Sequence, residues 1–552
     1  MNSTKKWKKK VRNFLNKHPQ LMWIKKKVDF EKNLKPKLRK QLEFKSNITL
    51  PSNLSSKKIL VPLIETSHYQ YLQILIVAKA LQLRGADVKV LLCGSRLDGC
   101  EIKNSRTQSK DPCLNCRFNA KEVVPLFQLD TLYLADFISD SEVRSLRTSA
   151  YKIADFYPEK YDYEGIDLIP IVNDSVVRFF YGKLPDNTQK IKSVRSQHLT
   201  SAMISCEVAK RINRSFCPDI IFNNMLYSYS AWAPYSIYFQ KEKKSLFTCS
   251  ISAFNFKAIV LNSMELFISN SRYEKFRGNR DNYFLNDDEK DELIKFVNNR
   301  ISLKTNIFKN ANCFQGNQDI SAELSIDPNK RNIFLFSNIY WDVGLTEKGK
   351  LFGNVIEWVL GTINLVKNDN KCHLYIKTHP WEKYDSSPSS KGIDDFIHEK
   401  YPVLPKNVTL ILPEYKISPY QLFPHIDLGI LFNGTLGLEM LLHNIPVVIT
   451  GLSPYGGVGL VHEPESLEEY KNILLGKVLP LEPSIDEVNL FAYFYFIKSL
   501  IPWTLTMQAY SDNFKGFTFD SLDDIMPGKD KYLDHICNCI LDPENTIVEG
   551  WE

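Results

Sequence analysis

The chain has 552 residues, of which 44% are hydrophobic and 12% aromatic, and it carries a formal net charge of +7. Such a length exceeds one ordinary hydrophobic core and predicts two main domains, and the composition excludes a mainly disordered chain. The sequence contains no apolar stretch long enough to span a membrane, and its lysine-rich start lacks the apolar centre of a secretion signal. We therefore expect a cytoplasmic protein.

The net charge hides an uneven distribution along the chain. Residues 1–58 contain 18 Lys and Arg against 3 Asp and Glu, a charge of +15, whereas the remainder has 52 against 60 and carries −8. Trp7, Val11, Phe14 and Leu15 form an apolar stripe at helical spacing within the basic segment. Such a helix fits an anionic membrane surface, and a solvated basic helix docked on the protein is the equal alternative. The acidic remainder argues against binding to nucleic acid.

A strand–helix–strand unit follows the basic segment. Lys58–Ile64 and Asp87–Leu92 have the length and apolar character of buried strands, and Tyr71–Leu83 has helical periodicity between them. This pattern starts a parallel sheet, and ligands bind such sheets at the carboxyl ends of the strands. The loop after the first strand therefore places Glu65 and His68 where a catalytic base would act.

Four cysteines with the spacing C-x6-C-x12-C-x2-C follow the second strand. Their thiolates could converge around a turn to bind a structural zinc ion or an iron–sulfur cluster. Unliganded or redox-active thiols are the alternative, and the odd total of 11 cysteines argues against a disulfide framework. The four residues are Cys93, Cys100, Cys113 and Cys116.

A second polar strand end lies later in the first half. Ile191–Ile212 reads as a long helix and Phe216–Phe222 as the strand that follows it. Asn223, Asn224 and Tyr227 come directly after this strand and are candidates for contacts with an acceptor sugar. Turn-forming asparagines and a packed tyrosine are the structural alternative.

The second half of the chain restarts the same alternation of strands and helices. The strands are expected at Asn332–Phe336, Cys372–Lys377, Val408–Leu412 and Leu428–Phe432, and the segment Asn310–Arg331 reads as a linker. We therefore predict a basic extension, two α/β domains and a mainly helical end. Their expected ranges are 1–56, 57–325, 326–485 and 486–552.

Polar residues follow three strands of this second half, and the carboxyl ends of parallel strands lie on one edge of a sheet. Lys377 and His379 suit a phosphate through charge and an imidazole N–H, and the turn Asn433–Thr435 suits a second phosphate oxygen before the predicted helix Leu436–His443. These side chains are predicted to form a donor pocket. Its members are Asn338, Asp342, Lys377, His379, Asn433, Gly434, Thr435 and Glu439.

Three segments carry a resemblance to a known family. FLFSNIYWD (Phe334–Asp342), IKTHP (Ile376–Pro380) and FNGTLGLEMLLHNIPVVITGLSPYGGVG (Phe432–Gly459) resemble the capsule polysaccharide biosynthesis family. That family is similar to GT-B glycosyltransferases, which have two Rossmann-like domains facing across a cleft. The His-Pro pair and the Ser/Thr-containing turn are also similar to the elements with which bacterial GT-B sialyltransferases hold the CMP phosphate.

The resemblance implies roles for individual residues. His379 and Thr435 would contact the donor phosphate, and Glu439 would contact the ribose. The pocket would also be lined by Gly451, Tyr455 and Gly459.

The sequence therefore predicts a glycosyltransferase of surface or capsular polysaccharide synthesis, working in the cytoplasm or on the cytoplasmic membrane face. It would transfer a sugar from a nucleotide-activated donor, with CMP as the candidate nucleotide, to a glycan or lipid-linked acceptor. Residues 1–50 would contact an anionic membrane. The donor loops lack an Asp-x-Asp pair, so no metal cofactor is expected at the donor. A CDP-polyol phosphotransferase of teichoic-acid-like synthesis and a non-catalytic assembly scaffold are the alternatives.

Overall fold

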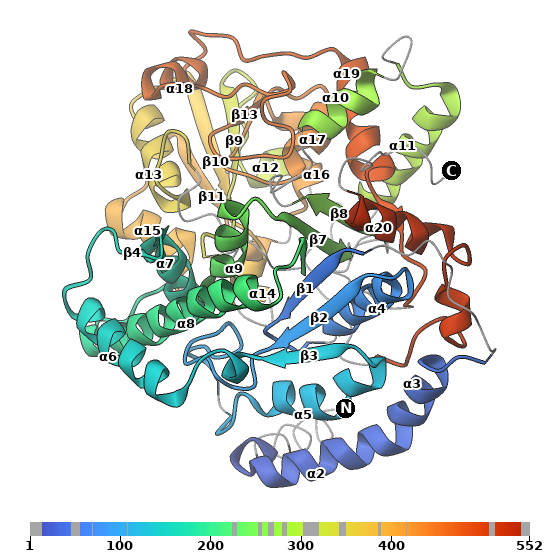
Figure 1. The fold of residues 1–552 in the computed structure, drawn as a ribbon. Coiled ribbons are helices and arrows are strands. Elements are labelled where there is room, and N and C mark those ends of the chain that lie inside the picture. The colour runs from blue at the N-terminus through green and yellow to red at the C-terminus, as the bar shows by residue number, and fades with distance from the viewer. Residues whose placement is uncertain are drawn as a thin grey trace. The chain divides into compact units, whose positions relative to one another are not determined.

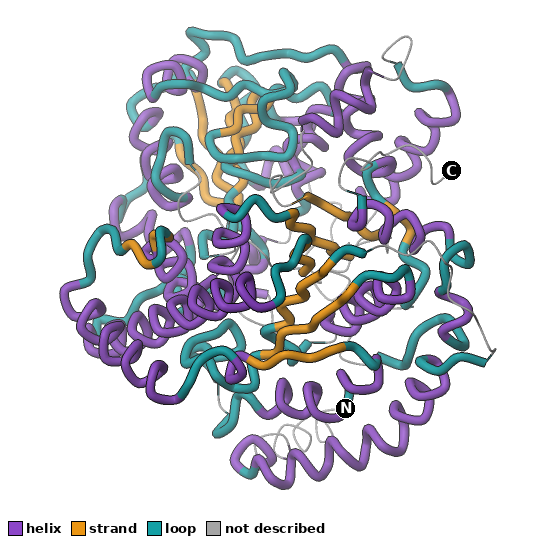
Figure 2. The backbone as a smooth tube through the Cα atoms, viewed as in Figure 1, coloured by secondary structure: helices purple, strands orange, loops and turns teal. Residues whose placement is uncertain are grey.

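The chain forms two compact units, each built on a β-sheet with helices packed beside it (Figures 1 and 2). Unit 1 contains Met1–Phe179, Pro185–Leu266 and Ile501–Glu552, and unit 2 contains Phe180–Leu184 and Phe267–Leu500. Both sheets are mainly parallel, which confirms the predicted α/β class. The computed structural model describes residues 11, 14–45, 56–68, 70–107, 109–223, 229–251, 257–262, 270–278, 284–301, 320–341, 349–384, 388–415, 417–506 and 514–542.

The sheet of unit 1 has the strand order β14-β8-β7-β6-β1-β2-β3. β1 (Lys58–Leu63) pairs in parallel with β2 (Asp87–Leu92) and with β6 (Ile220–Asn223). β6 begins later than predicted because the N–H of Phe216 closes the last turn of the preceding helix. The other strands of this unit are β3 (Asp130–Tyr133), β7 (Ser245–Ile251), β8 (Lys257–Asn262), β14 (Ile501–Pro502) and the small hairpin β4 (Asp162–Tyr163) and β5 (Ile166–Asp167).

Two hydrophobic cores lie on opposite faces of this sheet. Successive residues of a strand point to opposite faces, so Ile59 and Val61 enter one core and Leu60 enters the other. α4 (Gln70–Leu83) and α20 (Lys531–Leu541) contribute to the first core, and α6, α8 and α9 contribute to the second. The remaining helix bounds are α5 (Leu114–Glu122), α6 (Asp140–Phe156), α7 (Leu168–Phe179), α8 (Thr188–Ser215) and α9 (Tyr229–Lys241).

The described part of the basic segment packs on unit 1. α2 (Pro19–Asp29) continues through a π-helical turn, Phe30–Leu34, into α3 (Lys35–Gln41). Phe30 and Leu38 are buried in the first core of unit 1. Trp7 of the predicted apolar stripe lies outside the described residues. Within the described ranges, no helix is long and apolar enough to cross a membrane.

The sheet of unit 2 is parallel throughout and has the order β11-β10-β9-β12-β13. Its strands are β9 (Arg331–Phe336), β10 (Cys372–Lys377), β11 (Val408–Ile411), β12 (Leu428–Leu431) and β13 (Val447–Ile449). The helices of this unit are α10 (Asn270–Gly278), α11 (Asp287–Ile301), α12 (Ile320–Glu323), α13 (Val355–Val366), α14 (Trp381–Tyr384), α15 (Ile393–Lys400), α16 (Pro419–Leu422), α17 (Leu436–Leu441), α18 (Leu467–Leu474) and α19 (Ile485–Tyr493).

The boundaries of the units differ from the expected ranges 57–325, 326–485 and 486–552. Residues after Leu266 belong to unit 2, where the ring of Tyr273 packs on that of Phe491 with centroids 4.7 Å apart. Residues from Ile501 onward belong to unit 1, where β14 pairs with β8 and Asp534 forms an ion pair with Arg84. The end of the chain is therefore part of unit 1 rather than a separate helical segment.

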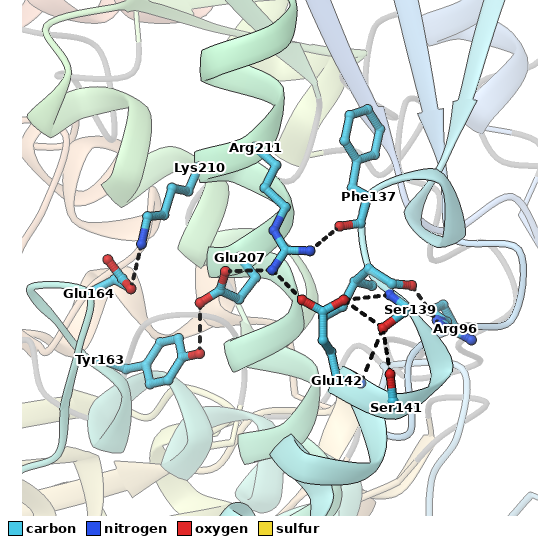
Figure 3. A network of polar contacts seen from close by, with 11 residues as sticks. Arg96, Phe137, Ser139, Ser141, Glu142, Tyr163, Glu164, Glu207, Lys210 and Arg211 are labelled. Carbon is cyan, nitrogen blue, oxygen red and sulfur yellow. Dashed lines mark hydrogen bonds and ion pairs between the residues drawn. The ribbon is translucent and has the colours of Figure 1, made fainter.

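A polar network joins three elements of unit 1 (Figure 3). The Arg211 guanidinium on α8 donates to Glu142 of α6 at 2.6 Å and to Glu207 at 3.3 Å. The hydroxyl of Tyr163, in the β4–β5 hairpin, donates to Glu207 at 3.0 Å. Glu142 also forms the capping box of α6 with Ser139. Hydrogen bonds from Arg211 and Ser139 hold the pKa of Glu142 down to about 2.

This shift predicts a pH-dependent contribution of Glu142 to stability. A carboxyl group whose pKa falls from 4.5 to about 2 on folding stabilises the folded state above pH 4.5, and that stabilisation disappears as the pH falls toward 2. Glu142→Gln should therefore lower the urea midpoint at pH 7, and the difference from wild type should shrink below pH 4.5. Exposed Glu159→Gln is the matched control. A difference that stays constant down to pH 3 would contradict this role of the charge.

Candidate functional site

The strand order of the sheet in unit 2 changes sides between β9 and β12, which makes this position a topological switch point. From β9 the chain adds β10 and β11 on one side, and it then returns to place β12 and β13 on the other side. Parallel sheets leave a crevice at such a switch point, outside the carboxyl ends of the two strands. The predicted donor residues Asn338 and Asn433 follow β9 and β12 and therefore lie at this switch point.

Hydrogen bonds tie three of the predicted loops together. Asn338 Nδ2 donates to the carbonyl oxygen of Asn433 at 3.1 Å, which links the loops after β9 and β12. The N–H of His379 donates to Ser337 Oγ at 3.1 Å, which links the loop after β10 to the loop after β9. The structure thus brings Asn338, His379 and Asn433 to one edge of the sheet, as predicted.

The protonation of the His379 ring follows from one contact. The backbone N–H of Trp381 donates to His379 Nδ1 at 3.2 Å, so Nδ1 is the unprotonated ring nitrogen. A neutral imidazole that accepts at Nδ1 carries its proton on Nε2. In this tautomer His379 Nε2 is a hydrogen-bond donor, which suits an anionic ligand.

The side chain of Asn338 has a polar atom without a partner. Its Oδ1 is buried and makes no hydrogen bond within the described part of the chain, while its Nδ2 holds Asn433. A buried acceptor without a partner costs free energy, about 1–3 kcal/mol, unless a ligand or water supplies a donor. The hydroxyl of a sugar or ribose would satisfy this atom.

The turn after β12 agrees with the sequence at Gly434 and differs from it in the helix that follows. Gly434 has φ +123°, a conformation that favours glycine, and its N–H contacts Asn433 Oδ1 at 2.6 Å. Thr435 precedes α17 and its side chain makes no capping hydrogen bond to that helix. α17 ends at Leu441 rather than at the predicted His443 and has only 6 residues, so its dipole contributes little to anion binding.

Two predicted pocket residues are buried and bonded within unit 2. Glu439 is buried and its Oε2 accepts from the hydroxyl of Tyr420 at 2.6 Å. Tyr455 is fully buried, and its hydroxyl donates to the carbonyl oxygen of Gly434 at 2.5 Å. Tyr455 therefore holds the Gly434 turn in place from behind.

The remaining predicted donor residues fall in different environments. Lys377 is the last residue of β10 and is buried. Gly451 lies against the end of β12, where an added Cβ would come 2.4 Å from the carbonyl oxygen of Phe432. Gly459 is exposed, and Asp342 lies outside the described residues.

Sequence reasoning missed three residues of this region. Ser337 and Tyr420 hold predicted site residues but were not singled out. Ser337 stands inside the FLFSNIYWD segment, and Tyr420 stands in no recognisable motif. Glu382 follows the His-Pro pair, and burial raises its pKa to about 8. Its Oε2 accepts from the N–H of Ile393 at the start of α15, and its Oε1 is buried without a partner in the described residues. Its place two residues after the His-Pro pair is the sequence signal that could have identified it.

Unit 1 has its own switch point, between β1 and β6. Glu65 lies in the loop after β1, and its Oε1 accepts from the backbone N–H groups of Ser67 at 2.6 Å and His68 at 3.2 Å. His68 is exposed. Asn223 is the last residue of β6 and is buried, with its Nδ2 bonded to the carbonyl oxygen of Pro62.

Glu65 and Asn223 therefore lie at the edge where acceptor chemistry was predicted, and the amide of Asn223 also joins the two strands at the switch point. Two further predicted acceptor residues, Asn224 and Tyr227, lie outside the described residues.

The four predicted cysteine ligands are half-buried free thiols beyond β2. Burial raises the pKa of Cys93 and Cys100, and it raises that of Cys116 to about 12. Cys113 is the N-cap residue of α5 and Cys116 lies in its first turn, where the N–H of Thr66 contacts Cys116 Sγ at 3.4 Å. Across the described ranges, no three His, Cys, Asp or Glu side chains are arranged to hold a metal ion. A metal at these cysteines stays a prediction, tested by elemental analysis after anaerobic purification.

The packing of Tyr455 against α17 predicts a coupled pair of substitutions. An added Cβ at Gly437 would lie 2.2 Å from the Tyr455 hydroxyl, so Gly437→Ala should cost about 1–3 kcal/mol of stability. Tyr455→Phe removes the hydrogen bond to Gly434 and should cost about 1 kcal/mol. Because the phenylalanine also removes the clashing oxygen, thermal unfolding of the double variant should show less than the summed loss. Fully additive losses would contradict the contact.

One family model matches the chain. It is described as capsule polysaccharide biosynthesis protein and covers residues 290–473, about a third of the chain. This range includes β9 to β13 and the loops that carry Asn338, His379 and Asn433. No curated protein matches the chain significantly.

Among solved structures, the chain is similar to KpsC of Thermosulfurimonas dismutans, described as a beta Kdo 2,4 transferase. The identity is 13%, the match covers 50% of this chain and 79% of that chain, and the TM-score is 0.31. The structure described as the beta Kdo 2,7 transferase of the same KpsC has 10% identity over 52% of this chain and 80% of that chain, with a TM-score of 0.28.

A UDP-GlcNAc 2-epimerase from Neisseria meningitidis, bound to UDP-GlcNAc, matches at 11% identity over 80% of this chain and all of its own, with a TM-score of 0.23. These TM-scores are too low to support a family assignment, so the assignment depends on the match to the family model. That match confirms the resemblance carried by the three motifs: residues 290–473, within unit 2, have the sequence pattern of the capsule polysaccharide biosynthesis family.

Proposed function

We propose that this protein is a glycosyltransferase of capsule polysaccharide synthesis that binds a nucleotide-activated sugar at the switch point of unit 2. The observation that carries the proposal is the joining of three loops. The loops after β9, β10 and β12 are tied by the hydrogen bonds of Asn338 and His379, within the range that matches the family. Parallel sheets bind their ligands outside the carboxyl ends of the strands, at a switch point of this kind.

In this proposal His379 donates from Nε2 to a phosphate oxygen of the donor. The Trp381 contact at Nδ1 fixes the tautomer before the ligand arrives, so no reorganisation is needed as negative charge develops on the departing nucleotide. Thr435 supplies a hydroxyl beside the open Gly434 turn, and Lys377 supplies positive charge at the end of β10. These protein groups, rather than a divalent cation, are proposed to stabilise the leaving group.

The proposed reaction is a displacement at the anomeric carbon of the donor sugar. An acceptor hydroxyl oxygen forms a bond to that carbon, the bond from the carbon to the phosphate oxygen breaks, and the nucleotide leaves with the electron pair. The acceptor proton passes to a base, for which Glu65 and His68 of unit 1 are the proposed candidates. A GT-B arrangement, a glycan or lipid-linked acceptor and a cytoplasmic location are further parts of this proposal.

Nucleotide binding tests the donor site directly. We expect one of CMP, CDP, UDP and GDP to raise the melting temperature, since a ligand at about a hundredfold excess over its Kd stabilises the folded state by about 2.7 kcal/mol. His379→Ala and Thr435→Ala should each lose most of this shift. His398→Ala, which changes an exposed histidine of α15 in the same unit, should retain it.

The outcomes separate the alternatives. Stabilisation by CDP alone would favour transfer of a polyol phosphate, and the absence of any shift in the wild-type protein would contradict the donor site. A shift that survives both substitutions would place the nucleotide elsewhere.

A further inference from the structure

The helix α2 exposes apolar side chains on one side. Leu21, Ile24 and Val28 follow the spacing i, i+3 and i+7, which aligns them along one face of a helix. Their side chains are 46%, 58% and 58% exposed, and Phe14 in the preceding turn is 53% exposed. Exposed apolar residues scattered singly need no explanation, but an aligned row of this kind does.

The opposite side of the same helix is held on unit 1. The ring of Trp23 packs edge-on against Phe118 of α5, with centroids 5.2 Å apart. The ammonium group of Lys26 donates to Asn115 Oδ1 at 2.9 Å and lies 4.9 Å from the centre of the Phe118 ring. Phe30 is buried beside the same ring, with centroids 5.7 Å apart.

These contacts fix how α2 is turned on unit 1. In Figure 1, α2 runs along the lower edge of unit 1, beside α5. Because the Trp23 side is occupied, the row Leu21, Ile24 and Val28 is directed away from the core of the unit. The stripe predicted from the sequence, Trp7, Val11, Phe14 and Leu15, precedes this row; Trp7 lies outside the described residues, and Phe14 is exposed like the row itself.

Positive charge surrounds the exposed row. The exposed lysines Lys17, Lys25, Lys27 and Lys32 lie before, beside and after it. Of the three nearby carboxylates, Glu31 is paired with Lys35 at 2.5 Å, Glu122 of α5 is paired with Lys27 at 3.4 Å, and Asp29 is exposed. Lys17, Lys25 and Lys32 form no ion pair within the described part of the chain. Residues 1–58 carry +15 and the rest of the chain −8, so an anionic surface attracts this edge of the protein and repels the remainder.

We propose that α2 is the membrane-docking surface of this protein, with Leu21, Ile24 and Val28 inserted at the headgroup level of an anionic bilayer and the lysines on lipid phosphates. A narrow apolar row bordered by lysines is the pattern of a helix that lies in the membrane interface. Nucleic acid would use the lysines but leave the apolar row in water. This docking goes beyond the proposed sugar transfer and does not depend on it.

Flotation of the full-length protein with vesicles tests the proposal. We expect binding to vesicles that contain phosphatidylglycerol, weak binding to pure phosphatidylcholine, and release at high salt, because the lysine contribution is screened. Ile24→Glu/Val28→Glu should lower the bound fraction about ten-fold or more, since it places two carboxylates in the inserted row.

A matched control carries the same change of charge. Val403 and Leu479 are 86% and 78% exposed in unit 2, and Val403→Glu/Leu479→Glu should bind vesicles close to the wild-type level. An unchanged melting temperature shows that each variant is folded. Equal flotation of the α2 variant and the wild type would overturn the proposal, as would a wild-type protein that ignores anionic vesicles. Loss of a self-associated state in the α2 variant, without vesicle binding by the wild type, would instead identify a second protein chain as the occupant.

Discussion

The hydrogen bond from Asn338 to the carbonyl of Asn433 joins the two strand ends between which the sheet of unit 2 reverses direction. Two further hydrogen bonds converge on the same loops. His379 is attached to the same loop through Ser337, and Tyr455 supports the Gly434 turn from the buried side. Parallel sheets bind ligands at such a point, and the hydrogen bonds bring the loops of Asn338, His379 and Asn433 together there.

Hydrogen bonds within unit 2 preorganise the groups proposed to bind the donor. The N–H of Trp381 selects the His379 tautomer that donates from Nε2, and the turn at Gly434 is held from two directions. Fixed donors stabilise a developing negative charge without the cost of reorienting at the moment of reaction. The helix α2 is oriented in a similar way. Its contacts with α5 determine that Leu21, Ile24 and Val28 are the side chains that a bilayer would meet.

Local sequence patterns predict those parts of the fold that consist of buried strands and the loops after them. Asp87–Leu92 and Cys372–Lys377 are strands at the predicted bounds because each is an apolar run closed by turn-forming residues. The loops after β9, β10 and β12 meet because each follows a strand of the same parallel sheet, and the carboxyl ends of such strands share one edge. The pairing of β14 with β8 was not predictable, because a strand of two residues depends on a partner far along the chain. The hydrogen bonds of Ser337 and Tyr420 were also not predictable, since a hydrogen bond between distant segments leaves no periodicity.

In the proposed function a donor phosphate binds at the switch point of unit 2. A crystal structure of the protein with the nucleotide that raises its melting temperature tests this most directly. We expect a phosphate oxygen within hydrogen-bonding distance of His379 Nε2, with the nucleotide beside Asn338 and the Gly434 turn. A nucleotide bound with its phosphate away from His379, or bound in unit 1, would contradict it.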